Sequence, residues 1–121
     1  MSSRFYQLVI DSHDPHALAR FWSQVLEQPI VLESDDEVIV AADERAYPGL
    51  CFLPVPDDKT TKNRLHIDLN PDDRDAEVER LLALGATRAD VGQGPDVSWV
   101  TLADPEGNEF CVLRRHENLV V

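Results

Sequence analysis

Three side chains able to bind a metal or transfer a proton lie in two short apolar segments. His66 and Asp68 alternate with apolar residues in segment 65–69 (LHIDL), and Cys111 does so in segment 110–112 (FCV). Since alternate residues of a strand point to one face, His66 and Asp68 are expected to share a face. An imidazole, a carboxylate and a thiol on one face would suit a general base, metal ligands or a nucleophile.

Three interpretations of Cys111 stay open. Free cysteine is among the most buried residue types, so its sulfur would simply pack in a pocket wall. A distorted zinc site of His66, Cys111 and either Asp68 or Asp11 would use three protein ligands and a water. A nucleophilic pair would need a neighbouring cation such as protonated His66. His66 is also the candidate catalytic base, because imidazole works near neutral pH without tuning.

Two similar halves of the chain supply the elements that position these residues. In the first, a strand-like segment 6–10 leads into Asp14, an N-cap, and a helix whose apolar residues recur at three- and four-residue steps. The second half repeats this order from His66 through Asp73 to a helix ending at Gly85. An offset of 59 residues aligns Gln7 with His66 and Asp14 with Asp73.

Each helix is followed by a predicted meander of strands. The closing strands, 50–55 and 109–114, align Phe52 with Cys111, and Val31-Leu32 and Val91 mark the middle strands. The sequence therefore predicts an α+β fold in which two βαβββ modules form a curled mixed sheet around a central cleft. We expect a single domain over 1–121, with module one at about 4–55, a connector at about 56–63 and module two at about 64–115.

Strand alternation divides the side chains between helix and cleft. In module two, Phe110 and Val112 are expected against the helix and Leu113 on the cleft face. The repeat transfers this pattern to module one, which places Cys51 against a helix, so a disulfide between Cys51 and Cys111 is not expected. Trp99 is a candidate to stack on a ligand ring. The predicted ligand-binding residues are Gln7, Val9, Asp11, Phe52, His66, Asp68, Trp99 and Cys111.

Composition excludes several classes of partner. The formal net charge of −12 would repel nucleic acid. No stretch approaches the roughly 18 apolar residues of a membrane span, and the N-terminus does not resemble a signal peptide. Two cysteines are too few for a disulfide framework. We therefore expect a cytoplasmic protein with no nucleic-acid or membrane partner.

The sequence resembles the glyoxalase, bleomycin-resistance and extradiol-dioxygenase superfamily, also called the vicinal oxygen chelate fold. The resemblance lies in Asp14-Pro15 with segment 21–26 (FWSQVL), in segment 64–69 (RLHIDL) and in segment 103–110 (ADPEGNEF). It is greatest to the short bacterial glyoxalase-like proteins. It implies paired βαβββ modules, a homodimer, and a site inside the curled sheets.

The resemblance also identifies four positions from which metal-dependent members take ligands. These positions hold Gln7, Phe52, His66 and Cys111 in this sequence. Phenylalanine cannot ligate, and the set lacks the carboxylates typical of a glyoxalase I or an extradiol dioxygenase. We therefore expect no metal cofactor and neither of these activities, with a bound divalent metal as the alternative.

The sequence thus predicts a protein that binds a small organic molecule without a conventional metal site, as bleomycin-resistance members do with cationic compounds. An alternative is a lyase or isomerase of glyoxalase I type, acting on a small oxygenated metabolite with His66 as base or metal ligand. A third hypothesis is a regulatory module that pairs through an exposed sheet edge and takes no ligand.

Overall fold

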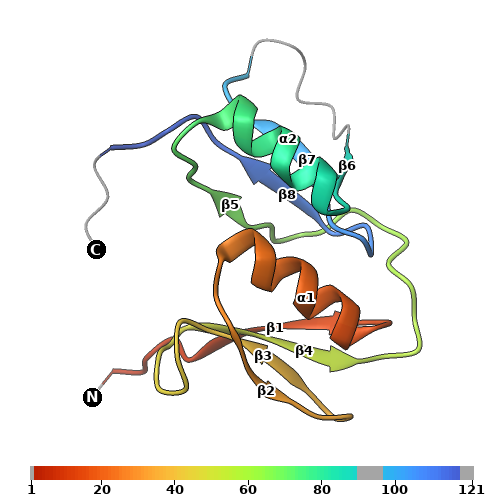
Figure 1. The fold of residues 1–121 in the computed structure, drawn as a ribbon. Coiled ribbons are helices and arrows are strands. Elements are labelled where there is room, and N and C mark those ends of the chain that lie inside the picture. Colours follow the sequence, from red (N-terminus) through yellow and green to blue (C-terminus); the bar gives the residue numbers. More distant parts are fainter. Residues whose placement is uncertain (1, 90–96, 118–121) are drawn as a thin grey trace. The chain divides into compact units, whose positions relative to one another are not determined.

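A computed structural model of the protein describes residues 2–89 and 97–117 (Figure 1). Contacts group the chain into two compact units, Met1–Asp58 and Lys59–Val121, which we call the first and second modules. The boundary falls within the predicted connector. Each module has one strand, one helix and then three strands, which confirms the predicted α+β fold with two βαβββ repeats.

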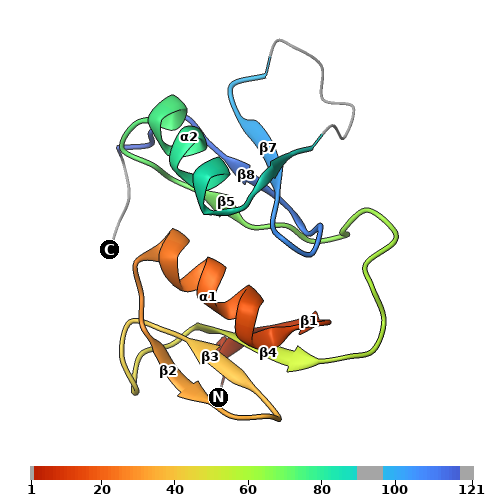
Figure 2. The same cartoon turned by 45° about the vertical axis from the view of Figure 1, so that its right-hand side comes forward.

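The two modules have the same sheet topology (Figures 1 and 2). The first contains β1 (Gln7–Ser12), α1 (Pro15–Leu26), β2 (Ile30–Glu33), β3 (Val38–Val40) and β4 (Gly49–Pro54), with sheet order β1-β4-β3-β2. The second contains β5 (Asp68–Leu69), α2 (Arg74–Leu84), β6 (Thr87–Arg88), β7 (Val100–Ala103) and β8 (Glu109–Val112), with order β5-β8-β7-β6. In each sheet the first and last strands pair in parallel and the other pairs are antiparallel.

The middle strands of the meanders match the sequence prediction in part. Val31 and Leu32 lie in β2, as expected. Val91 lies outside the described residues, and the corresponding strand of the second module is β6, at Thr87–Arg88.

Both helices begin at the predicted aspartates. Asp14 accepts a hydrogen bond from the Ala17 N–H at 3.2 Å, and Asp73 accepts one from the Ala76 N–H at 3.1 Å. These side chains satisfy amide groups that have no partner within the helix. Helix α2 ends at Gly85 with a φ of 123°, a conformation that favours glycine. Neither described helix combines the length and apolar character that a membrane crossing requires.

In the second module, strand alternation separates a helix face from an open face as predicted. Leu102, Phe110 and Val112 are almost completely buried on the face that α2 covers. Cys111 pairs with Thr101 on one side and with Asp68 on the other, so these three side chains share the opposite face. The sheet therefore presents the predicted polar row away from α2.

In the first module, the predicted faces of β4 are wrong. Phe52 pairs with Val38 and Ile10, has 0% exposure, and lies on the face that α1 covers. Cys51 pairs with Val9 and Ile39 on the opposite face, although we expected it against a helix. Phe52 therefore cannot be a ligand-binding residue of the open face.

The physical reason is the length of chain between the first and the closing strand, which is 42 residues from Val9 to Cys51 and 43 residues from Asp68 to Cys111. Val9 of β1 corresponds to Asp68 of β5 at the offset of 59, and their partners are Cys51 and Cys111. The closing strands therefore align at an offset of 60. Because a slip of one residue moves every side chain to the other face, Cys51 rather than Phe52 matches Cys111.

Candidate functional site

The open face of the second module contains a pocket of about 440 Å³. Pockets of this size, with apolar walls and a few convergent polar groups, are typical sites for small molecules. The lining residues come from the segment before β5, from β5, from β7 and the residue preceding it, and from β8 and the residue following it: Lys62, His66, Asp68, Trp99, Thr101, Glu109, Cys111 and Leu113.

The pocket floor is fixed by paired strands. The Cys111 N–H donates to the Ile67 carbonyl at 2.9 Å, and the Leu113 N–H donates to the Leu69 carbonyl at 2.9 Å. These bonds hold the segment containing His66 and Asp68 against β8. Since Asp68 stands directly opposite Cys111, the position of this pair follows from backbone register.

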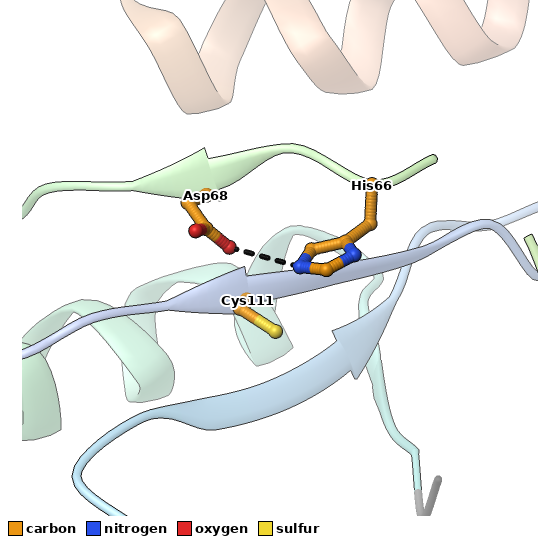
Figure 3. A group of neighbouring side chains, drawn as sticks. All are labelled: His66, Asp68 and Cys111. Atoms are coloured by element: carbon orange, nitrogen blue, oxygen red, sulfur yellow. Dashed lines mark ion pairs between the residues drawn. The ribbon is translucent and has the colours of Figure 1, made fainter. Parts of the chain in front are cut away.

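His66, Asp68 and Cys111 form a compact cluster on this floor (Figure 3). One nitrogen, oxygen or sulfur atom of each lies within 4.8 Å of the others. His66 Nε2 is 3.1 Å from Asp68 Oδ1, and these two side chains are 44% and 50% exposed. Cys111, by contrast, is 7% exposed. We call this group the HDC cluster.

The Cys111 sulfur has a polar neighbour in addition to the cluster. Its Sγ lies 3.5 Å from Thr101 Oγ1, on the adjacent strand β7. The burial of Cys111 agrees with a packing role, and its place in the pocket lining also makes its sulfur available as a ligand.

An ion pair ties the preceding segment to the start of β8. Lys59 Nζ lies 2.8 Å from Glu109 Oε1, and the Asn63 N–H donates to the same oxygen at 3.1 Å. Burial raises the pKa of the Glu109 carboxyl, but the hydrogen bonds from Lys59 and the backbone outweigh burial and hold the pKa below its ordinary value. This pair positions the segment that brings Lys62 to the pocket.

The side chains of the HDC cluster are of the types that bind a metal of borderline softness such as zinc. Its imidazole, carboxylate and thiol are all zinc ligands, and three protein ligands with an open position are typical of reactive zinc sites. Of the four positions that the resemblance identified, Phe52 has no donor atom and faces α1, and the structure places Cys51 at the position that matches Cys111.

The structure brings together some of the predicted site residues and places others in the first module. His66, Asp68, Trp99 and Cys111 all line the second-module pocket. Gln7, Val9 and Asp11 share the open face of the first-module sheet, where Val9 is 44% exposed.

Sequence analysis missed three lining residues. Thr101 and Glu109 have the same strand parity as Cys111, so alternation alone was a sufficient signal for them. Lys62 lies in the connector, where no periodicity indicates the direction of a side chain.

The sequence matches the family model of the glyoxalase-like domain over residues 7–113. No curated protein matches it.

Solved structures of this fold are similar at low sequence identity. A glyoxalase/bleomycin resistance protein/dioxygenase family enzyme from Burkholderia phytofirmans is 18% identical, with a TM-score of 0.72 over 94% of this chain and 100% of that chain. A glyoxalase-related enzyme from Fulvimarina pelagi is 15% identical, with a TM-score of 0.70 over 94% and 89% of the two chains. A lactoylglutathione lyase from Agrobacterium tumefaciens is 20% identical, with a TM-score of 0.60 over 94% and 95%.

Proposed function

Because the chain belongs to the glyoxalase-like domain family of the vicinal oxygen chelate superfamily, we propose that its second module binds a small organic molecule. The observation that carries the proposal is the pocket of about 440 Å³, in which ionisable groups converge beside an aromatic ring. Such a combination suits a ligand that is oriented by polar contacts and held by apolar ones.

The lining residues favour an aromatic ligand with a cationic group. The Trp99 ring offers a surface for stacking or for a cation. Asp68 supplies a half-exposed carboxylate on the pocket floor. The net charge of −12 attracts cations at long range. This is binding of the bleomycin-resistance type, without turnover and without a required metal.

A second candidate is a lyase or isomerase of glyoxalase I type. The observation that favours it is the contact of 3.1 Å between His66 Nε2 and Asp68 Oδ1 inside the pocket. A carboxylate within hydrogen-bond distance orients an imidazole, so His66 would act as a general base on a small oxygenated metabolite. A lactoylglutathione lyase is among the proteins of similar fold.

The proposal includes two properties of the whole protein. The first is a homodimer, which the family resemblance implies and which sedimentation of the purified protein tests. The second is a cytoplasmic location. Cys51 and Cys111 are free thiols, and a reducing compartment keeps thiols in that state.

The test is a thermal-shift screen of small aromatic and cationic compounds, run with a strong chelator so that no metal contributes. A ligand at about 100 times its Kd stabilises by about 2.7 kcal/mol, which raises the Tm of a domain this size by several degrees. Trp99→Leu should weaken the binding of any hit. The matched control is Tyr47→Leu, which removes an exposed aromatic ring of the first module.

Two outcomes would count against metal-free binding. One is a screen in which no compound shifts the Tm. The other is a hit whose binding falls equally in both variants. Turnover of a hemithioacetal that is lost in His66→Ala would instead support the second candidate.

A further inference from the structure

We infer that the ligand of the second-module pocket is an aromatic zwitterion, in which a carboxylate accompanies the ring and the cationic group. Lys62 binds the carboxylate, Asp68 binds the cationic group and Trp99 contacts the ring; all three residues line the pocket. The inference rests on the proposed function and deepens it. It names the charge class of the ligand and gives Lys62 a role in choosing it.

One charged residue of the pocket lining is already neutralised. Glu109 Oε1 lies 2.8 Å from Lys59 Nζ and accepts the Asn63 N–H at 3.1 Å. The Lys59 and Glu109 side chains are only 19% and 14% exposed, so this pair is largely closed to solvent. It therefore offers a ligand no net charge.

Lys62, the second of the two lysines in the chain, is different. It is exposed, and its Nζ lies 3.4 Å from the Asn63 carbonyl, which is a long hydrogen bond. A carbonyl does not neutralise an ammonium, and no carboxylate within residues 2–89 and 97–117 forms an ion pair with this one. Lys62 thus brings an uncompensated positive charge to the pocket lining.

The opposite charge in the pocket belongs to Asp68. Its side chain is 50% exposed, and its Oδ1 lies 3.1 Å from His66 Nε2 (Figure 3). A carboxylate has two oxygens, so Asp68 can keep the imidazole contact and still accept a hydrogen bond from a ligand ammonium. The lining therefore presents an exposed anion as well as an exposed cation.

These two charges separate three classes of aromatic ligand. An amine without an anionic group pairs with Asp68 but brings a like charge toward Lys62. An acid without a cationic group pairs with Lys62 but meets Asp68 and the net charge of −12. A zwitterion satisfies both side chains and carries no net charge, so the field of the protein does not repel it. A phosphate in place of the carboxylate would add negative charge and lose that advantage.

The backbone beside Lys62 is anchored on both sides. Lys59 precedes it and Asn63 follows it, and both bind the same Glu109 oxygen. The long-range ion pair therefore holds the start of the Lys62 side chain beside the pocket. A binding group that is held in place before the ligand arrives loses less conformational freedom on binding.

The backbone beside Trp99 is anchored as well. Arg74, the first residue of α2, donates from its guanidinium to the Ser98 carbonyl at 2.6 Å. This bond ties the residue before Trp99 to the helix. The ring and the ammonium are thus both carried by segments that tertiary contacts fix within the second module.

The test is calorimetry of the full chain, in the presence of chelator, with nine probes that share three rings. Three are the amino acids phenylalanine, tyrosine and tryptophan. Three are the amines that lack their carboxylate: phenethylamine, tyramine and tryptamine. Three are the arylpropanoates that lack their amino group. We expect at least one amino acid to bind roughly tenfold more tightly than its amine, as one charged hydrogen bond would give, and more tightly than its acid.

Two variants and one control assign the preference to its residues. Lys62→Gln should lower the affinity for the amino acids roughly tenfold and leave the affinity for the amines unchanged or higher. Asp68→Asn should weaken the amino acids and the amines but not the acids. The control is Arg88→Gln, which removes a positive charge from a side chain that is 63% exposed and is not among the lining residues. It should bind all nine probes as the parent does.

Because Lys62 is exposed, Lys62→Gln should unfold at the Tm of the parent when no probe is present. The inference is wrong if the amines bind at least as tightly as the amino acids, if Lys62→Gln keeps the preference, if Arg88→Gln loses it to the same extent, or if none of the nine probes binds. Tight binding of the amines alone would leave the proposed function standing without this inference. The wider thermal-shift screen decides the proposed function separately.

Discussion

At the scale of residues, the two cysteines occupy matching register positions in their modules and have different neighbours. Cys51 Sγ lies 3.8 Å from Glu37 Oε2, whereas Cys111 Sγ lies beside the Thr101 hydroxyl. Burial raises the pKa of the Cys51 thiol, and the neighbouring Glu37 carboxylate raises it further. The same strand position has therefore produced a thiol held in its protonated form in one module and a pocket-lining sulfur in the other.

We predict that alkylation of the native protein near neutral pH modifies Cys111 before Cys51. The thiolate is the reacting species, so a raised pKa leaves Cys51 with less of it, and Cys51 is also the more deeply buried at 1% exposure. Mass spectrometry of peptides from a time course measures both rates. Glu37→Gln should speed modification of Cys51 and leave Cys111 unchanged, and modification of Cys51 first would contradict the prediction.

At the scale of elements, local signals predicted the helices well, but the register of distant strands was harder to predict. Asp14 and Asp73 begin helices because their carboxylates cap amides a few residues away, which a sequence shows directly. The face of Phe52 depends on the net length of chain between the first and the closing strand of its module, and an internal repeat does not specify that length. In the second module the strands followed simple parity, so Cys111 and Asp68 were placed correctly.

The sequence did not predict that Lys62 and Asn63, in the segment before β5, would lie beside the pocket. Lys62 and Asn63 have no apolar periodicity, and only tertiary contacts position them. One such contact is the bond from the Asn63 N–H to Glu109. Strand alternation predicted the residues of the pocket floor. The position of the segment that contains Lys62 depends instead on the long-range ion pair between Lys59 and Glu109.

We predict that Glu109→Gln lowers the free energy of unfolding by about 1–2 kcal/mol at neutral pH, as expected for loss of a charged hydrogen-bond acceptor that is largely buried. The pKa of Glu109 is lowered on folding, so its contribution is fully present above the unfolded value and is lost as pH falls through the folded value. The difference in the free energy of unfolding between variant and parent should therefore become smaller in acid. Urea unfolding across a pH series measures it.

The control for that series is Glu79→Gln, which removes an exposed carboxylate 3.8 Å from Arg88 on the same module. Exposed pairs contribute little, so this variant should remain close to the parent at every pH. If Glu109→Gln lowers the free energy of unfolding by the same amount at every pH, the shape of the side chain, and not its charge, holds the segment before β5 in place.

At the scale of the whole molecule, a duplicated βαβββ topology carries an uneven distribution of chemistry. The second module holds the pocket and the HDC cluster, whereas the matching row of the first module holds Gln7, Val9 and Cys51. The two modules therefore share one backbone frame, and a few strand positions make the open face of the second the more polar. The net charge of −12, in contrast, is a property of the whole chain.

This charge predicts that salt stabilises the protein. Acidic residues outnumber basic ones by 23 to 11, so compaction brings like charges together, and that repulsion acts against folding. Raising NaCl from about 0.01 M to about 0.15 M shortens the screening length from roughly 30 Å to roughly 8 Å, which weakens the repulsion between separated carboxylates. The Tm at neutral pH should therefore rise by a few degrees.

Near pH 4.5, where the charges of the chain balance, the same change in salt concentration should have little effect on the Tm. An equal rise at both pH values would attribute the stabilisation to salt exclusion instead of charge, and a fall at neutral pH would mean that attractive pairs such as Lys59–Glu109 outweigh the net repulsion.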